Sequence, residues 1–160
     1  MTRKHLLLMR HAKTLQARPG QADFERELAA KGERQSASIR DWLNGQLPAG
    51  AWQVLCSPAR RTRQTWEQCQ PQPVNCNVSY IDAIYGSSRI ELIDLLAEQL
   101  DAHNRVILVG HNPAISELVA SLAHADEEAR RGFSTGDMAL LHSASGDLAQ
   151  VWELDWLYRP

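Results

Sequence analysis

The chain has 160 residues, of which 44% are hydrophobic and 22% charged, and its formal net charge is -2. This composition excludes a disordered chain, and without a basic excess or an apolar run of about 20 residues it argues against nucleic-acid and membrane partners. We expect one domain over residues 1–160, cytoplasmic and monomeric, and no disulfide framework, because the three cysteines include no CxxC pair.

Strand-like and helical patterns alternate along the chain. Short apolar runs predict strands, and apolar residues at helical spacing predict helices between them. In chain order, the expected elements are a strand at 6–9, a helix at 33–43, a strand at 52–56, a helix at 60–69, a strand at 78–81, a helix at 90–100, a strand at 106–109, a helix at 114–123, a strand at 138–141 and a last strand from 148 to about 156. This alternation indicates an α/β fold with three layers and a mainly parallel central sheet.

The last two predicted strands should form a hairpin at an edge of the sheet. Ser145-Gly146-Asp147 between them is a turn signal. Because side chains alternate along a strand, Trp152 and Trp156 should lie on the same side of the last strand, in a packing role.

Histidine and arginine side chains follow three of the predicted strands. Arg10 and His11 come after the first strand, Arg61 comes shortly after Ser57 at the end of the second, and His111 follows the fourth. Ligands of open α/β sheets bind beyond the carboxyl ends of the strands. We therefore expect these segments, which are distant in sequence, to form one site at that edge.

Such a cluster suits the transfer of a phosphoryl group. Arginine forks bind phosphate with two hydrogen bonds, and fixed positive charges lower the pKa of a nearby histidine. A neutral imidazole at pH 7 is a nucleophile, and a second histidine can stabilise charge on the phosphoryl oxygens. The residues therefore permit phosphoryl transfer through a histidine without a metal or other cofactor.

Four separated motifs resemble those of the histidine phosphatase superfamily, which has the phosphoglycerate-mutase-like fold. Residues 8–14 contain Arg10-His11-Ala12 where the family has Arg-His-Gly. Residues 23–35 resemble the Asp-x-x-Arg-x-Leu…Gly stretch, and residues 57–65 resemble Ser-Pro-x-x-Arg-Ala-x-Gln-Thr. Residues 109–113, Val-Gly-His-Asn-Pro, resemble the motif of the second histidine.

The resemblance implies a role for each matching residue. His11 would be the nucleophile that becomes phosphorylated, while Arg10, Arg61 and His111 would bind and polarise the phosphoryl group. Arg26 would be a further residue of the pocket. The short chain and the Arg-His-Ala variant look most like the SixA-type branch, which lacks the large insertions that cap the site in bigger relatives. That branch implies a phosphohistidine phosphatase, whose partner is a phosphorylated protein such as a histidine phosphotransfer domain.

The general acid of larger relatives has no clear counterpart here. Residues 81–86 contain no glutamate, so Asp82 is the nearest carboxylate and Glu91 is an alternative. A protonated phosphoramidate nitrogen, as in phosphohistidine, leaves more easily than an alkoxide. The absence of a clear acid therefore favours phosphohistidine over a sugar phosphate.

Other functions remain open at this point. Within the same chemistry the chain could be a phosphatase for small phosphate esters or a mutase, and in another class it could be a catalytically weak module that binds phosphorylated residues. A thiol phosphatase using Cys56 is disfavoured because no Cys-x5-Arg cradle follows it, and the other histidines show no metal-ligand spacing.

Two of the singled-out residues also have plain structural interpretations. Ser57 could cap the following helix, with Pro58 in its first position. Arg26 could pair with Asp23 or with Glu27. The tertiary structure decides between these alternatives.

Overall fold

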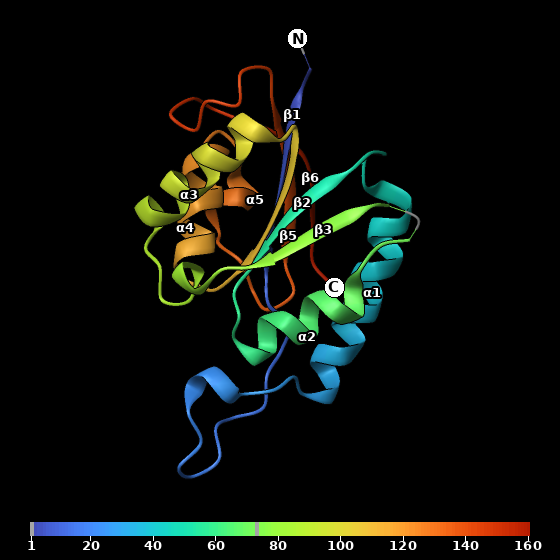
Figure 1. The fold of residues 1–160 in the computed structure, drawn as a ribbon, viewed down its shortest axis with the longest axis vertical. Coiled ribbons are helices and arrows are strands. Elements are labelled where there is room, and N and C mark those ends of the chain that lie inside the picture. Colours follow the sequence, from blue (N-terminus) through green and yellow to red (C-terminus); the bar gives the residue numbers. More distant parts are fainter. Residues whose placement is uncertain (1, 73) are drawn as a thin grey trace.

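The computed structural model describes residues 2–72 and 74–160, and they form a three-layer α/β/α sandwich (Figure 1). In chain order the elements are β1 (Lys4–Arg10), η1 (Asp23–Glu25), α1 (Ala30–Gln46), β2 (Trp52–Cys56), α2 (Arg60–Cys69), β3 (Cys76–Tyr80), η2 (Asp82–Ile84), α3 (Arg89–Ala102), β4 (Arg105–Gly110), α4 (Ala114–Leu122), α5 (Glu127–Arg130), β5 (Met138–Ser143) and β6 (Glu153–Tyr158). The α/β class expected from the sequence is thus confirmed.

Within the described residues the strands form one sheet in the order β3-β2-β4-β1-β5-β6. The first four strands of this order run parallel, and β5 and β6 add the expected antiparallel edge. Arg10 pairs with Gly110, and Cys56 pairs with Val109, so β1, β2 and β4 end at the same level. His11, Ser57 and His111 therefore leave the sheet side by side.

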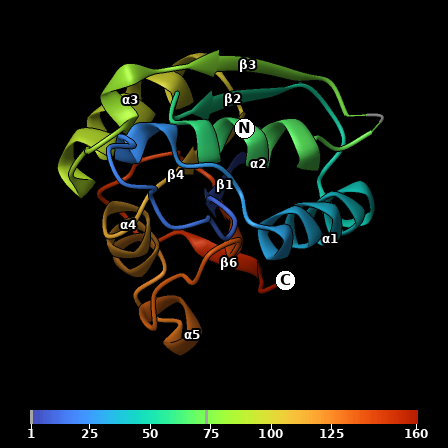
Figure 2. The ribbon, with the colours of Figure 1, turned by 90° about the horizontal axis from the view of Figure 1, so that it is seen from below.

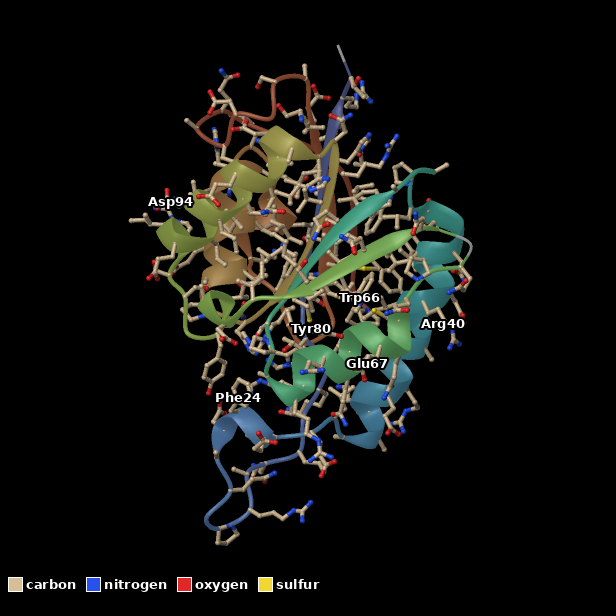
Figure 3. All side chains as sticks on the ribbon, viewed as in Figure 1. Phe24, Arg40, Trp66, Glu67, Tyr80 and Asp94 are labelled. Carbon is tan, nitrogen blue, oxygen red and sulfur yellow. The ribbon has the colours of Figure 1, made fainter. Side chains whose placement is uncertain are left out.

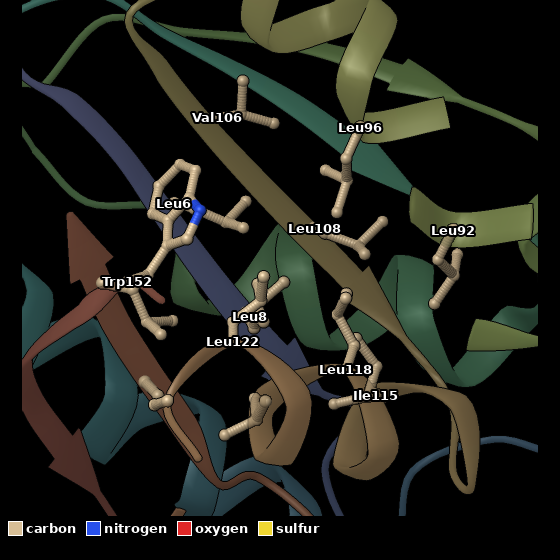
Figure 4. Packing of buried hydrophobic residues seen from close by; sticks show 14 of the residues in the cluster. Leu6, Leu8, Leu92, Leu96, Val106, Leu108, Ile115, Leu118, Leu122 and Trp152 are labelled. Atoms are coloured by element: carbon tan, nitrogen blue, oxygen red, sulfur yellow. The ribbon is translucent and has the colours of Figure 1, made fainter. Parts of the chain in front are cut away.

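Helices cover both faces of the sheet because its central strands are apolar on both sides. On one face α3, α4 and α5 pack over Leu6, Leu8 and Leu108, and Figure 4 shows part of this cluster, with Leu96 of α3 and Leu118 of α4 on either side of Leu108. Burying these side chains stabilises the fold by about 25 cal/mol for each Å² of apolar surface removed from water.

On the other face α1 and α2 pack over the opposite side chains of the same strands. Trp66 of α2 is fully buried and points toward the sheet, whereas Glu67 beside it and Arg40 of α1 lie on the solvent side (Figure 3). Both helices thus present one apolar side to the core, as an amphipathic helix should.

The last strand differs from its prediction. It begins at Glu153 rather than at residue 148, so Trp152 lies before it, and the pairing of β5 with β6 shifts register between Leu140 and Leu141. As a result Trp152 packs in the cluster under α3 and α4, whereas Trp156 packs against the cluster under α1 and α2. The expectation of one shared side is wrong, because a bulge and a late strand start break the alternation of side chains.

The segment between β1 and α1 extends beyond the strand ends. Figure 1 shows it at the lower end of the molecule, and Figure 2 shows η1 beside α2. In the described ranges, no helix combines the length and apolar character needed to cross a membrane.

Candidate active site

Two imidazoles meet at the carboxyl end of the sheet. His11 follows β1 and His111 follows β4, and their ring centroids lie 5.4 Å apart with the planes tilted by 56°. His11 is only 8% exposed, so its surroundings are protein groups rather than bulk water. The structure thus brings together two residues that are a hundred positions apart in sequence.

The hydrogen bond of His11 defines which ring nitrogen is free. Nδ1 lies 2.8 Å from the carbonyl oxygen of Ala12, which can only accept, so Nδ1 carries the hydrogen. In a neutral ring Nε2 then holds the lone pair. The N–H of Ala12 donates in turn to Oγ1 of Thr65 on α2 at 3.0 Å, which fixes the backbone at this position.

Burial lowers the pKa of His11 to about 3, against the hydrogen bond to Ala12, and the neighbouring His111, Arg61 and Arg10 lower it further. Burial likewise lowers the pKa of His111 to about 4, with Arg61 and Arg10 acting in the same direction and Asp23 against it. Both rings are therefore neutral at pH 7 in the absence of a ligand, and Nε2 of His11 is available as a nucleophile.

His111 is oriented by Ser57. Its Nε2 lies 2.7 Å from Oγ of Ser57, and that oxygen also accepts the N–H of Ala59 at 3.3 Å. With the hydroxyl donating to Nε2, the hydrogen of a neutral His111 lies on Nδ1, which is the tautomer we assign to the ligand-free site. Ser57 is not the N-cap of α2, because that helix begins at Arg60 with Ala59 as its N-cap; its side chain holds the second histidine instead.

Arg10 and Arg61 complete the cluster, and each is anchored through part of its guanidinium. Arg10 donates from Nη1 to the carbonyl of Phe133 at 2.9 Å, and Asn112 donates to the same carbonyl at 2.8 Å. Arg61, only 6% exposed, donates twice to Asp23. These contacts hold both arginines in place and leave their Nε–H groups for another acceptor.

Three buried nitrogens of this cluster have no hydrogen-bond partner among the described residues: Nε of Arg10, Nε of Arg61 and Nδ1 of His111. The two arginine Nε atoms carry hydrogens, as does Nδ1 in the tautomer assigned to His111, and a buried donor without an acceptor costs about 1–3 kcal/mol. Such donors next to a neutral nucleophilic imidazole are suited to an anion with several oxygens.

Asp23 of η1 connects side chains from three separate segments of the chain. Its carboxylate accepts hydrogen bonds from Arg26, Arg61 and the hydroxyl of Tyr85, at 3.1, 3.0 and 2.9 Å. Burial raises the pKa of Asp23, but these hydrogen bonds outweigh it and hold the pKa at about 2. Asp23 is therefore ionised at neutral pH and acts as the counter-ion of Arg61.

The hydrogen bonds of Arg26 all lie within the segment between β1 and α1. Its three guanidinium nitrogens donate to Leu15, Asp23 and Thr14. Of the two pairings open from the sequence, the one with Asp23 is present. Arg26 thus reaches the cluster through Asp23.

The two carboxylates considered as a general acid lie apart from these contacts. Asp82 is exposed, and its side chain makes no hydrogen bond within residues 2–72 and 74–160. Glu91 accepts hydrogen bonds from Ser88 in the capping box of α3. Burial raises the pKa of the Cys56 thiol to about 12, which leaves no thiolate for catalysis.

The start of α1 approaches the backbone that follows His11 closely. A Cβ at Gly32 would lie 2.1 Å from the carbonyl oxygen of Lys13, so only glycine fits there. Gln35 accepts the N–H of Lys13 at 2.8 Å and donates to the carbonyl of Thr135 at 3.0 Å. Gly32 and Gln35 of the second motif therefore position the nucleophile loop.

Sequence reasoning missed the contributions of Tyr85 and Phe133. Tyr85 lies within the segment searched for an acid, and its hydroxyl binds Asp23 while its ring packs edge-on against His111, with centroids 5.6 Å apart. Phe133 acts through its backbone carbonyl, for which the sequence carries no signal.

Comparison with known proteins relates this arrangement to others. The model of the histidine phosphatase superfamily (branch 1) matches residues 6–81. An uncharacterized protein of Mycobacterium tuberculosis is 34% identical over 144 residues, which cover 85% of this chain and 87% of that protein. An uncharacterized protein of Mycobacterium leprae is 30% identical over 145 residues, covering 85% and 88%.

Solved structures give a similar result. A candidate phosphohistidine phosphatase SixA from Nakamurella multipartitia is 32% identical, covers 100% of this chain and 98% of its own, and has a TM-score of 0.82. A second candidate SixA, from Agrobacterium tumefaciens, is 26% identical with 98% of both chains covered and a TM-score of 0.80. The protein histidine phosphatase SixA in complex with tungstate, at 22% identity and a TM-score of 0.75 over 96% of this chain and 95% of its own, shares the fold.

Proposed function

The chain belongs to the histidine phosphatase superfamily, and from this membership we propose that it is a metal-independent phosphatase that removes phosphate from phosphohistidine on a protein, through a phosphorylated His11. One observation carries the proposal: Nε2 of His11 holds a lone pair, while beside it Nε of Arg10, Nε of Arg61 and Nδ1 of His111 are buried and have no hydrogen-bond partner among the described residues. A phosphoryl group would supply the acceptors that these donors lack.

In the first step Nε2 of His11 attacks phosphorus. The new P–N bond forms as the bond from phosphorus to the substrate nitrogen breaks, and the leaving imidazole keeps the electron pair. Nδ1–H of His11 stays bonded to the Ala12 carbonyl and stabilises the positive charge that develops on the ring. The N–H groups of Arg10, Arg61 and His111 stabilise the charge on the phosphoryl oxygens.

In the second step water attacks phospho-His11. The P–Nε2 bond breaks, its electron pair returns to Nε2, and inorganic phosphate leaves. The negative charge of the bound phosphoryl group favours protonation of His111, whose Nε2 could then donate to Ser57. This pairing would keep the ring in place in both charge states.

The choice of phosphohistidine rests on the leaving group. Among the described residues no carboxyl group is hydrogen-bonded to His11 or His111: Asp23 is ionised, Glu91 caps a helix, and Asp82 is exposed. A protonated phosphohistidine ring leaves without such an acid, whereas an alkoxide needs one. The likeness to SixA-type proteins supports the same substrate, and a cytoplasmic phosphotransfer protein would be the natural partner.

The test is to trap the intermediate. The protein is mixed with a histidine phosphotransfer domain carrying radiolabelled phosphate and quenched within one turnover. We expect label on the chain that is stable to base and labile to acid, none on His11→Ala, and normal labelling of His124→Ala, which changes an exposed histidine whose side chain makes none of the contacts described for the cluster. Turnover by His11→Ala should fall by several orders of magnitude, and Arg61→Ala should lower it about 10²-fold or more.

The alternatives give different outcomes. Faster turnover of small phosphate esters than of phosphohistidine would favour the ester phosphatase or mutase. Tight binding of phosphorylated protein by His11→Ala, with no labelled intermediate on the wild type, would indicate a binding module and defeat the enzyme assignment.

A further inference from the structure

An aromatic wall stands next to the second histidine. Tyr85 follows η2, and its ring packs edge-on against His111 with centroids 5.6 Å apart and planes at 80°. Phe24 of η1 packs against the other side of this small cluster, edge-on to Tyr85 at 5.1 Å and 88°. Tyr85 is 37% exposed, so this residue next to His111 is accessible from solvent.

The ring of Tyr85 is held from two further directions. Its hydroxyl donates to Oδ2 of Asp23 at 2.9 Å, the same oxygen that accepts from Arg61 at 3.0 Å. The guanidinium carbon of Arg61 lies 5.9 Å from the centroid of the Tyr85 ring. Together with the contact to His111, these contacts come from three different segments of the chain. The ring is therefore held in place before a ligand binds.

The position of this wall bears on the leaving group. In-line displacement puts the leaving nitrogen on the side of phosphorus opposite Nε2 of His11. For a phosphoryl group bound by His11, His111 and Arg61, we expect the leaving group to lie on the solvent side of the site, where Tyr85 adjoins His111 and Arg61.

We propose that Tyr85 is a specificity-determining residue that packs against a flat, aromatic leaving group, the imidazole of phosphohistidine, and so selects it over leaving groups without a ring. The proposal rests on the function proposed above and adds a selectivity to it. An aromatic pair contributes about 0.5–1.5 kcal/mol beyond area burial, which sets the size of the expected effect.

The experiment compares two P–N substrates that differ in the ring. Phosphohistidine has an imidazole leaving group, whereas phosphoramidate releases ammonia. We expect Tyr85→Leu to lower kcat/KM for phosphohistidine about fivefold to tenfold more than it lowers kcat/KM for phosphoramidate, so the ratio of the two substrates changes by that factor. Tyr85→Phe should keep the ratio of the two substrates within about twofold of wild type, because it keeps the ring and loses only the hydroxyl.

A matched control is available at the end of β3. Tyr80→Leu removes a ring that packs against Arg63 and not against His111. The guanidinium carbon of Arg63 lies 4.3 Å from the centroid of the Tyr80 ring. Tyr80→Leu should leave the substrate ratio unchanged. Inhibition by vanadate, which probes the phosphoryl pocket alone, should be the same in Tyr85→Leu and in Tyr85→Phe, which lacks the same hydroxyl, and so shows that loss of the ring leaves the pocket intact.

If Tyr85→Leu lowers kcat/KM equally for both substrates, their ratio is unchanged. That result would overturn the selectivity proposal while the proposed function stands. Weaker vanadate inhibition of Tyr85→Leu than of Tyr85→Phe would also overturn it, because the ring of Tyr85 would then be supporting the pocket. If the wild type turns over neither P–N compound, the proposed function itself fails.

Discussion

Arg61 is held by Asp23 at two points: Nη1 donates to the backbone carbonyl at 2.7 Å, and Nη2 donates to the carboxylate at 3.0 Å. The two residues are 38 positions apart. The short helix η1 thus holds an arginine of α2 in the site through the half-exposed carboxylate of Asp23.

Removing that carboxylate should loosen Arg61. We expect Asp23→Ala to lower kcat/KM about tenfold to hundredfold, less than Arg61→Ala, because the guanidinium remains but loses its fixed position. A double-mutant cycle measures the coupling. In the Arg61→Ala background the Asp23 substitution should have little further effect, and fully additive losses would contradict this role.

Asp82 offers a direct test of the missing general acid. Its exposed side chain has no hydrogen bond among the residues described above, so Asp82→Asn should keep kcat on phosphohistidine within about twofold of wild type. Steady-state kinetics at pH 7 checks this. A loss greater than tenfold would instead identify Asp82 as the acid.

Two glycines of α1 give opposite expectations for stability. Gly32→Ala would force a Cβ against the Lys13 carbonyl, so we expect a loss of about 1–3 kcal/mol in the free energy of unfolding, together with reduced activity. Gly45 lies in the same helix with nothing within 4 Å of an added Cβ. Gly45→Ala should therefore gain up to about 1 kcal/mol. Urea denaturation of both variants provides the comparison, and similar changes in both would refute the close-approach argument.

Stability should fall as the pH drops below 6.5. The folded pKa values of His11 and His111, about 3 and about 4, lie below the ordinary value of 6.5, so between pH 6.5 and 4.5 the unfolded chain binds protons that the folded chain does not. Each histidine then removes up to about 1.4 kcal/mol of stability per pH unit. His11→Gln should flatten this dependence, and His124→Gln, at an exposed position, should not. An unchanged slope in His11→Gln would contradict the burial of a neutral His11.

Much of the fold and part of the site could be predicted from the sequence. The strand at 52–56 and the helix at 60–69 coincide with β2 and α2, because continuous apolar runs and helical spacing are local signals. The placement of Arg10, His11 and His111 at one edge followed from chain direction alone, since parallel strands end together. Arg26 and Asp82 were weaker inferences, because spacing says little about where a loop side chain points.

The sequence by itself determined the layered α/β architecture and the edge at which the two histidines emerge, because both depend on local apolar periodicity and strand direction. Only the tertiary structure decided that Asp23 binds Arg61, that Tyr85 packs on His111, and that Trp152 and Trp156 face opposite sides of the sheet. Those outcomes depend on the paths of loops and on a bulge between strands, where contacts between distant segments, rather than local pattern, set the geometry.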